Sequence, residues 1–76
     1  RAEAARAEQR RTEELTRLAA GLRVQSIMQG TVAVARVNGL PVRVGSVVNG
    51  FTVVEIGPAS VAFEAEGRKF ERSLER

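Results

Sequence analysis

The spacing of apolar residues changes once along this chain, near Gly21. Before that point large apolar side chains are few, and Leu15 and Leu18 follow, together with Leu22, the three-four spacing of one helix face. After it, apolar and polar residues alternate with a period of two, which is typical of strands with one buried face. The pattern therefore predicts a helix over residues 2–20 followed by a β-domain.

Residues 1–20 are expected to form a charged amphipathic helix. They are rich in Ala, Glu and Arg and lack Gly and Pro, and Gly21 is expected to end the helix in the left-handed conformation. The stripe of Leu15, Leu18 and Leu22 covers only the last two turns. Three roles stay open: docking on the β-domain, the end of a longer coiled coil that would allow a homodimer, or a charged linker that is helical in part.

The pair Asn38-Gly39 stands between two β-branched runs and predicts a hairpin. A two-residue type I′ turn needs positive φ at both central positions, which Asn and Gly tolerate best. The turn pairs Val37 with Leu40 and places an apolar set on one face, which we expect to be core. This set is Ala33, Ala35, Val37, Leu40, Val42 and Val44. The other face carries Val32, Val34, Arg36, Pro41 and Arg43.

The rest of the chain repeats this alternation of strands and turns. A first strand over residues 22–28 has a bulge or an end near Ser26, and further strands follow at 51–56, 60–66 and 69–74. Val47 and Val48 are interpreted as a short link, and a Glu66-Gly67 turn pairs Glu64 with Lys69. The predicted fold is mainly β: an N-terminal α-helix followed by a small six-stranded antiparallel β-sandwich or barrel over residues 21–76. Strands one to three form one sheet, and strands four to six form the other.

Composition removes most catalytic chemistry. The 76 residues contain no Cys and no His, so thiolate chemistry, histidine bases and Cys/His zinc sites are excluded. The carboxylates Glu55, Glu64, Glu66 and Glu71 have no nucleophile nearby in the pattern, although the strand of Glu55 is apolar on both faces. We expect a protein that is not an enzyme and has no cofactor, metal or small-molecule substrate.

The charge pattern favours a protein partner over a nucleic acid. Twelve Lys and Arg stand against nine Asp and Glu, and between residues 24 and 54 the only charged residues are Arg36 and Arg43. A nucleic-acid binder is expected to carry a denser basic stripe with stacking aromatic residues. Two alternatives stay open: a small β-barrel that binds nucleic acid or another polyanion through Arg23, Arg36, Arg43 and the Arg-rich helix, and a purely structural oligomerisation module.

Several short segments together resemble one family. They are Ala35-Arg-Val-Asn-Gly39, Val42-Arg-Val-Gly45, Gly50-Phe-Thr-Val-Val-Glu-Ile-Gly57, Val61-Ala-Phe63, the closing Gly67 and Phe70, and the opening strand Leu22-Arg-Val-Gln-Ser-Ile27. This arrangement resembles the C-terminal domain of the type II secretion protein B family and its pilus-biogenesis relatives. The resemblance covers roughly residues 22–74. Ser46 stands where the family often has an acid, and a charged helix replaces the family's Pro-rich linker.

The resemblance implies a non-catalytic connector in a type II secretion or type IV pilus machine. Domains of this family lie in the periplasm, are tethered to the inner membrane and contact the outer-membrane secretin, so a role in protein transport is expected. The chain opens on Arg1 without a Met or a signal sequence, and we expect it to be part of a longer protein. Its lack of Cys leaves the compartment open.

The alternation pattern also predicts where a partner binds. An edge strand can accept a strand of another chain through main-chain hydrogen bonds, and the first strand is the expected edge because the helix feeds directly into it. The expected contact residues of this edge are Leu22, Val24 and Ser26. The expected side-chain surface is Val32, Val34, Arg36 and Arg43, and the alternative for this surface is coverage by the chain's own helix through Leu15, Leu18 and Leu22.

Overall fold

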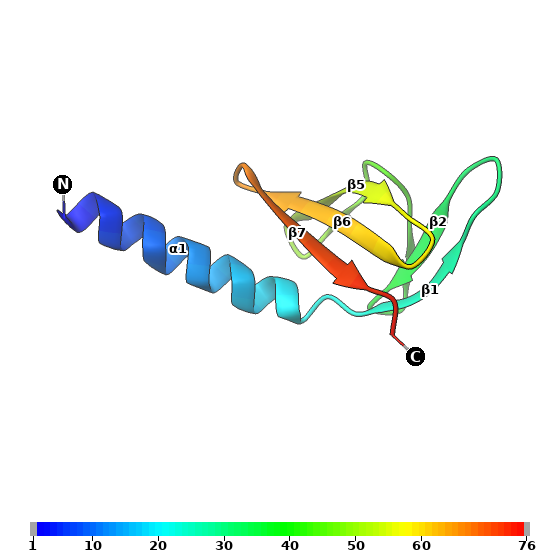
Figure 1. Cartoon of the computed structure of the whole chain (residues 1–76), viewed down its shortest axis with the longest axis horizontal. Coiled ribbons are helices and arrows are strands. Elements are labelled where there is room, and N and C mark those ends of the chain that lie inside the picture. The colour runs from blue at the N-terminus through cyan, green and yellow to red at the C-terminus, as the bar shows by residue number, and fades with distance from the viewer. Residues whose placement is uncertain (1, 76) are drawn as a thin grey trace.

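The computed structural model describes residues 2–75 and has one helix followed by strands (Figure 1). Its elements are α1 (Ala2–Ala20), β1 (Val24–Met28), β2 (Val34–Val37), β3 (Leu40–Val42), β4 (Val47–Val48), β5 (Phe51–Ile56), β6 (Ser60–Ala65) and β7 (Arg68–Ser73). The helix runs out to one side of the strands, and its N-terminal end lies far from the β1–β2 hairpin. The mainly β fold with an N-terminal helix is confirmed.

The strands form two antiparallel sheets, in the orders β1-β2-β3 and β4-β5-β6-β7. Buried residues of both sheets meet in one apolar core, which makes the domain a small sandwich. The predicted division into two sheets is confirmed, but the count of six strands is wrong. Val47 and Val48 pair with Thr52 and Phe51 and so form a short additional strand, β4, at the edge of the second sheet.

The predicted hairpin turn is present at Asn38-Gly39. The φ angles are 51° at Asn38 and 81° at Gly39, and Val37 pairs with Leu40 as expected. The expected core face is wrong at two of its members, because Leu40 is 57% exposed and Val44 is 60% exposed. Leu40 lies at the start of the edge strand β3 and Val44 lies beyond its end, whereas Val42 within the strand is 4% exposed, so of these three only Val42 reaches the core.

The last turns of α1 dock on the sandwich. Leu15, Ala19 and Leu22 are 2%, 4% and 0% exposed and belong to the core cluster. Leu18 is 47% exposed, because the stripe that faces the strands follows positions 15, 19 and 22 and leaves residue 18 beside it. Gly21 does not adopt the expected left-handed conformation; its N–H donates to the Leu18 carbonyl at 3.0 Å, so the helix ends in a tightened turn.

Two meanders of three strands repeat one layout. In β1-β2-β3 the row Ser26–Arg36–Pro41 crosses all three strands, and in β5-β6-β7 the row Thr52–Glu64–Lys69 does the same. The first strand of each meander has a register shift, and the second and third are joined by a two-residue turn with positive φ. The predicted pairing of Glu64 with Lys69 is part of this layout and is confirmed.

Candidate protein-binding surface

The four sheet edges differ in how well they can accept a partner strand. β3 carries Pro41, which has no N–H to donate, and β4 has only two residues. β7 has α1 packed beside it. β1 is the remaining edge, and it is the one that the sequence pattern predicted.

The chain itself covers the beginning of this edge. Val24 forms a parallel bridge with Leu74, and its carbonyl accepts a hydrogen bond from the N–H of Glu75 at 2.8 Å. Beyond this point, Ser26–Met28 pairs only with β2 among residues 2–75. The open part of the edge is therefore Ser26–Met28, which overlaps the predicted segment Leu22–Ser26 at one residue.

The predicted edge residues lie in different surroundings. The side chains of Leu22 and Val24 are 0% and 1% exposed and pack in the core, whereas Ser26 is exposed. Leu22 and Val24 thus anchor the strand, and a partner at this edge would meet its backbone and the side chains of Ser26 and Met28. Met28 is 73% exposed.

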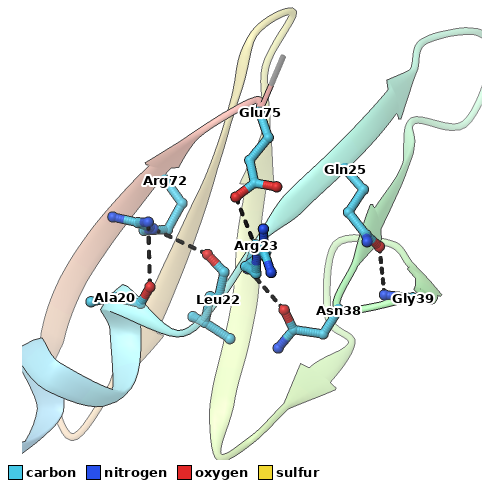
Figure 2. Close-up of polar contacts among 8 residues, drawn as sticks. All are labelled: Ala20, Leu22, Arg23, Gln25, Asn38, Gly39, Arg72 and Glu75. Carbon is cyan, nitrogen blue, oxygen red and sulfur yellow. Dashed lines mark hydrogen bonds and ion pairs between the residues drawn. The ribbon is translucent and has the colours of Figure 1, made fainter.

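Polar contacts hold β1 against the hairpin turn, as Figure 2 shows. The N–H of Arg23 donates to Asn38 Oδ1 at 2.9 Å, and the N–H of Asn38 donates to the Arg23 carbonyl at 3.0 Å. Gln25 lies at the bulge, and its Oε1 accepts the N–H of Gly39 at 2.6 Å. These contacts fix the start of the edge strand, and no pattern in the sequence marked Gln25 for this role.

The outer side of the first meander is an apolar surface with two arginines, here called the basic face. Its members are Ser26, Met28, Val34, Arg36, Pro41 and Arg43. A hollow of about 210 Å³ lies on this face between Met28, Val34 and Arg36. Val34 and Arg36, two of the four predicted surface residues, line this hollow, while Val32 and Arg43 line a neighbouring one. Pro41 lies opposite Arg36 as the hairpin register predicted, whereas Met28 was not predicted here, because its side of β1 depends on the bulge after Val24.

The helix leaves the basic face uncovered. α1 packs beside β7, and Leu15 and Leu22 contribute to the core between helix and strands. Arg36 and Arg43 are exposed, and no ion pair of either is present among the described residues. The alternative in which the chain's own helix covers this surface is therefore not the arrangement of the structure.

The outer side of the second meander is here called the acidic face. Its members are Thr52, Glu55, Ala62, Glu64, Lys69 and Glu71. Glu55 is exposed rather than held between two layers, because a bulge after Val53 turns it to the outside of the sheet. Three carboxylates and one ammonium group give this face a net negative charge.

Charged contacts fix the position of α1 on the strands. Arg11 donates from Nε to Glu66 Oε2 at 2.6 Å and also pairs with Glu14 at 2.9 Å. The hydrogen bond from Arg11 lowers the pKa of Glu66 below its ordinary value and raises that of Arg11. Arg72 donates from Nε to the Leu22 carbonyl at 3.1 Å, next to the end of the helix (Figure 2). A cation near the C-terminal carbonyl groups of a helix interacts favourably with the helix dipole and stabilises the helix.

These features define a class: a small sandwich with a docked N-terminal helix, one open strand edge and two oppositely charged sheet faces. Residues 2–75 contain no group of three or more acidic side chains arranged to hold a metal ion. Within the same range no helix is long and apolar enough to cross a membrane. Comparison of the chain with protein-family models, curated proteins and solved structures finds no match.

Proposed function

We propose that this chain is a non-catalytic connector domain that binds another protein of the cell envelope by accepting a strand at β1. The observation that carries the proposal is the open backbone edge at Ser26–Met28. An unpaired strand edge offers a row of N–H and C=O groups that a partner strand can pair with. The exposed side chain of Met28 lies beside this edge and adds apolar contact.

The family resemblance supplies the setting of this proposal. It favours a periplasmic domain of a type II secretion or type IV pilus machine, with the secretin as the partner component. Binding to a secretin needs no catalytic group, and the strand edge alone supplies the contact.

The helix fits the role of a tether in the full-length protein. Its C-terminal half is docked, whereas residues 3–10 are exposed and extend past the strands (Figure 1). The resulting molecule measures 48 × 22 × 17 Å. A helix held at a fixed angle would hold the sandwich at a set distance from its anchoring point, which suits a connector.

A polyanion-binding barrel is the second candidate, and the distribution of arginines disfavours it. Arg11 pairs with Glu66, and Arg23 pairs with Glu75 at 3.1 Å, so these cations are partly neutralised by the chain itself. Arg36 and Arg43 lie on the basic face, on a different sheet from β7, beside which α1 packs. The basic groups thus do not form the continuous stripe that phosphate binding favours.

Site-specific photo-crosslinking in cells that make the full-length protein tests the proposal. A crosslinking side chain at Met28 should form an adduct with a secretin or another envelope-machine subunit, identified by mass spectrometry. The matched control is Val47, which is 67% exposed on the short strand β4 and should give no such adduct.

The purified subunit then provides a second measurement. Its binding should be lost on Met28→Lys, since a lysine at a strand edge opposes pairing, and should change little with added salt. The proposal fails if Met28 gives no adduct with an envelope protein, or if the main adduct is a nucleic acid whose binding falls steeply with salt.

A further inference from the structure

The two meanders carry opposite charges at equivalent positions. Arg36 and Glu64 each stand two residues before a two-residue turn, and each occupies the middle of its three-strand row. Arg43 and Glu71 each stand four residues after the same turns. Arg36 and Glu64 therefore hold equivalent places in the two hairpins, while Arg43 lies just after the last residue of β3 and Glu71 lies within β7.

We propose that the basic face of one copy packs on the acidic face of a second copy, so that Arg36 and Arg43 meet Glu64 and Glu71. This inference goes beyond the connector proposal, because it uses the outer faces of the sheets rather than the backbone edge of β1.

Charge selects this pairing among the three that are available. Two basic faces in contact would bring four arginines together without an acid, since residues 24–54 contain none. Two acidic faces would oppose six glutamates with only two lysines between them. A basic face on an acidic face brings two arginines against three glutamates and one lysine, so opposite charges predominate in this contact.

Both faces are accessible in the folded chain. Arg36, Arg43, Glu64 and Glu71 are exposed, and α1 packs beside β7, where Glu71 lines a small hollow next to the helix. The two faces lie on opposite sides of the sandwich, so the contact is head-to-tail and can repeat from copy to copy into a ring or a row.

The size of the faces sets the strength of the contact. Three strands about 4.8 Å apart and four residues long give each copy a face of about 200 Å². This area is well below that of a stable interface, so association is expected only at millimolar concentration in solution or when copies are held together on a membrane.

Sedimentation velocity across a wide range of concentrations, up to the millimolar, tests the proposal. The native chain should associate reversibly. The variant Arg36→Glu/Arg43→Glu and the variant Glu64→Arg/Glu71→Arg should each associate at least about tenfold more weakly, because paired charges become like charges. A mixture of the two variants should associate again, since each basic face then meets an acidic face.

The matched control changes the same amount of charge on the exposed part of the helix, as Arg6→Glu/Arg10→Glu. This control should associate as the native chain does. A native chain that stays monomeric, a mixture that does not recover, or a control as impaired as the face variants would each overturn the proposal. Binding of an envelope subunit at β1 is tested separately by the identity of the Met28 adduct, since mass spectrometry distinguishes such a subunit from a second copy of this chain.

Discussion

The two three-stranded meanders of this sandwich share a backbone layout and differ in almost everything their side chains do. The turns Asn38-Gly39 and Glu66-Gly67 both have positive φ at two successive residues, and both set the pairing of the strands around them. The chemistry on the outer faces is opposite in charge. The comparison teaches that turn and alternation fix the register, whereas the surface that the register presents is free to vary.

The inner sides of the meanders differ as well. Three residues before the two-residue turn, the first meander buries Ala35, whereas the second meander buries the much larger Phe63. The rings of Phe51 and Phe70 in the second meander meet edge to face, with centroids 5.5 Å apart and an angle of 84°. The second meander thus supplies the large side chains of the core, and α1 packs beside β7, the strand that carries Phe70.

Shortening a helix side chain that packs in the core should have the largest effect on stability. Leu15→Ala removes a side chain that is 2% exposed and should lower the free energy of unfolding by about 2–4 kcal/mol. Leu18→Ala is the matched control, and at 47% exposure it should cost less than about 0.5 kcal/mol. Denaturant unfolding followed by circular dichroism measures both.

Equal effects of the two leucine variants would contradict docking through residues 15, 19 and 22. If Leu15→Ala is too unstable to purify, Leu15→Val offers a milder truncation at the same site. Its cost should remain above that of Leu18→Val.

Local patterns predicted most of the fold, because they depend on neighbours in the sequence. The Asn38-Gly39 turn predicted the pairing of its own hairpin, and the Glu66-Gly67 turn predicted the pairing of Glu64 with Lys69. The prediction that Leu18 lies on the docked face of the helix was wrong, and Ala19 lies there instead. The spacing of the leucines does not reveal which neighbouring positions of the helix meet the strands. Helix docking is decided by the whole surface that receives it.

The site was predicted less well, because it depends on residues far apart in the chain. The start of the β1 edge is covered by Leu74 and Glu75, fifty residues away, and nothing near Val24 signals this. The opposite charges of the two faces follow from a register that only the pairing of strands reveals. Arg36 and Arg43 were predicted to be part of a surface, but Glu64 and Glu71 were considered for function only as catalytic carboxylates.

Replacing the turn glycines should test whether the two turns are equivalent. Gly39 and Gly67 have φ of +81° and +75°, and a Cβ at either would meet nothing within 4 Å. Alanine at each therefore carries only the backbone cost of the left-handed region, about 1–2 kcal/mol of unfolding free energy. Gly30→Ala is the control, since Gly30 has open space and no positive φ, and it should change stability by less than about 0.5 kcal/mol.

A large difference between Gly39→Ala and Gly67→Ala would show that the turns are not equivalent. The measurement is again the midpoint of denaturant unfolding for each variant. Costs within error of each other, and both above that of Gly30→Ala, would support one shared turn geometry.

The smallest effect on stability should come from the ion pair of Glu66 with Arg11, a contact that the first turn lacks. At the equivalent position Asn38 accepts a neutral N–H, whereas Glu66 accepts hydrogen bonds from Arg11 that lower its pKa. Because the pKa of Glu66 is lower in the folded state than its ordinary value of 4.5, the contact stabilises the protein at any pH above 4.5. This stabilisation is lost as the pH falls through the lowered pKa of Glu66 in the folded state. Glu66→Gln should therefore lower the unfolding midpoint slightly at neutral pH and low salt, and the difference from the native chain should vanish in acid, where Glu66 is protonated. A difference that persists unchanged in acid would mean that the turn conformation of residue 66, rather than its charge on Arg11, is what the substitution disturbs.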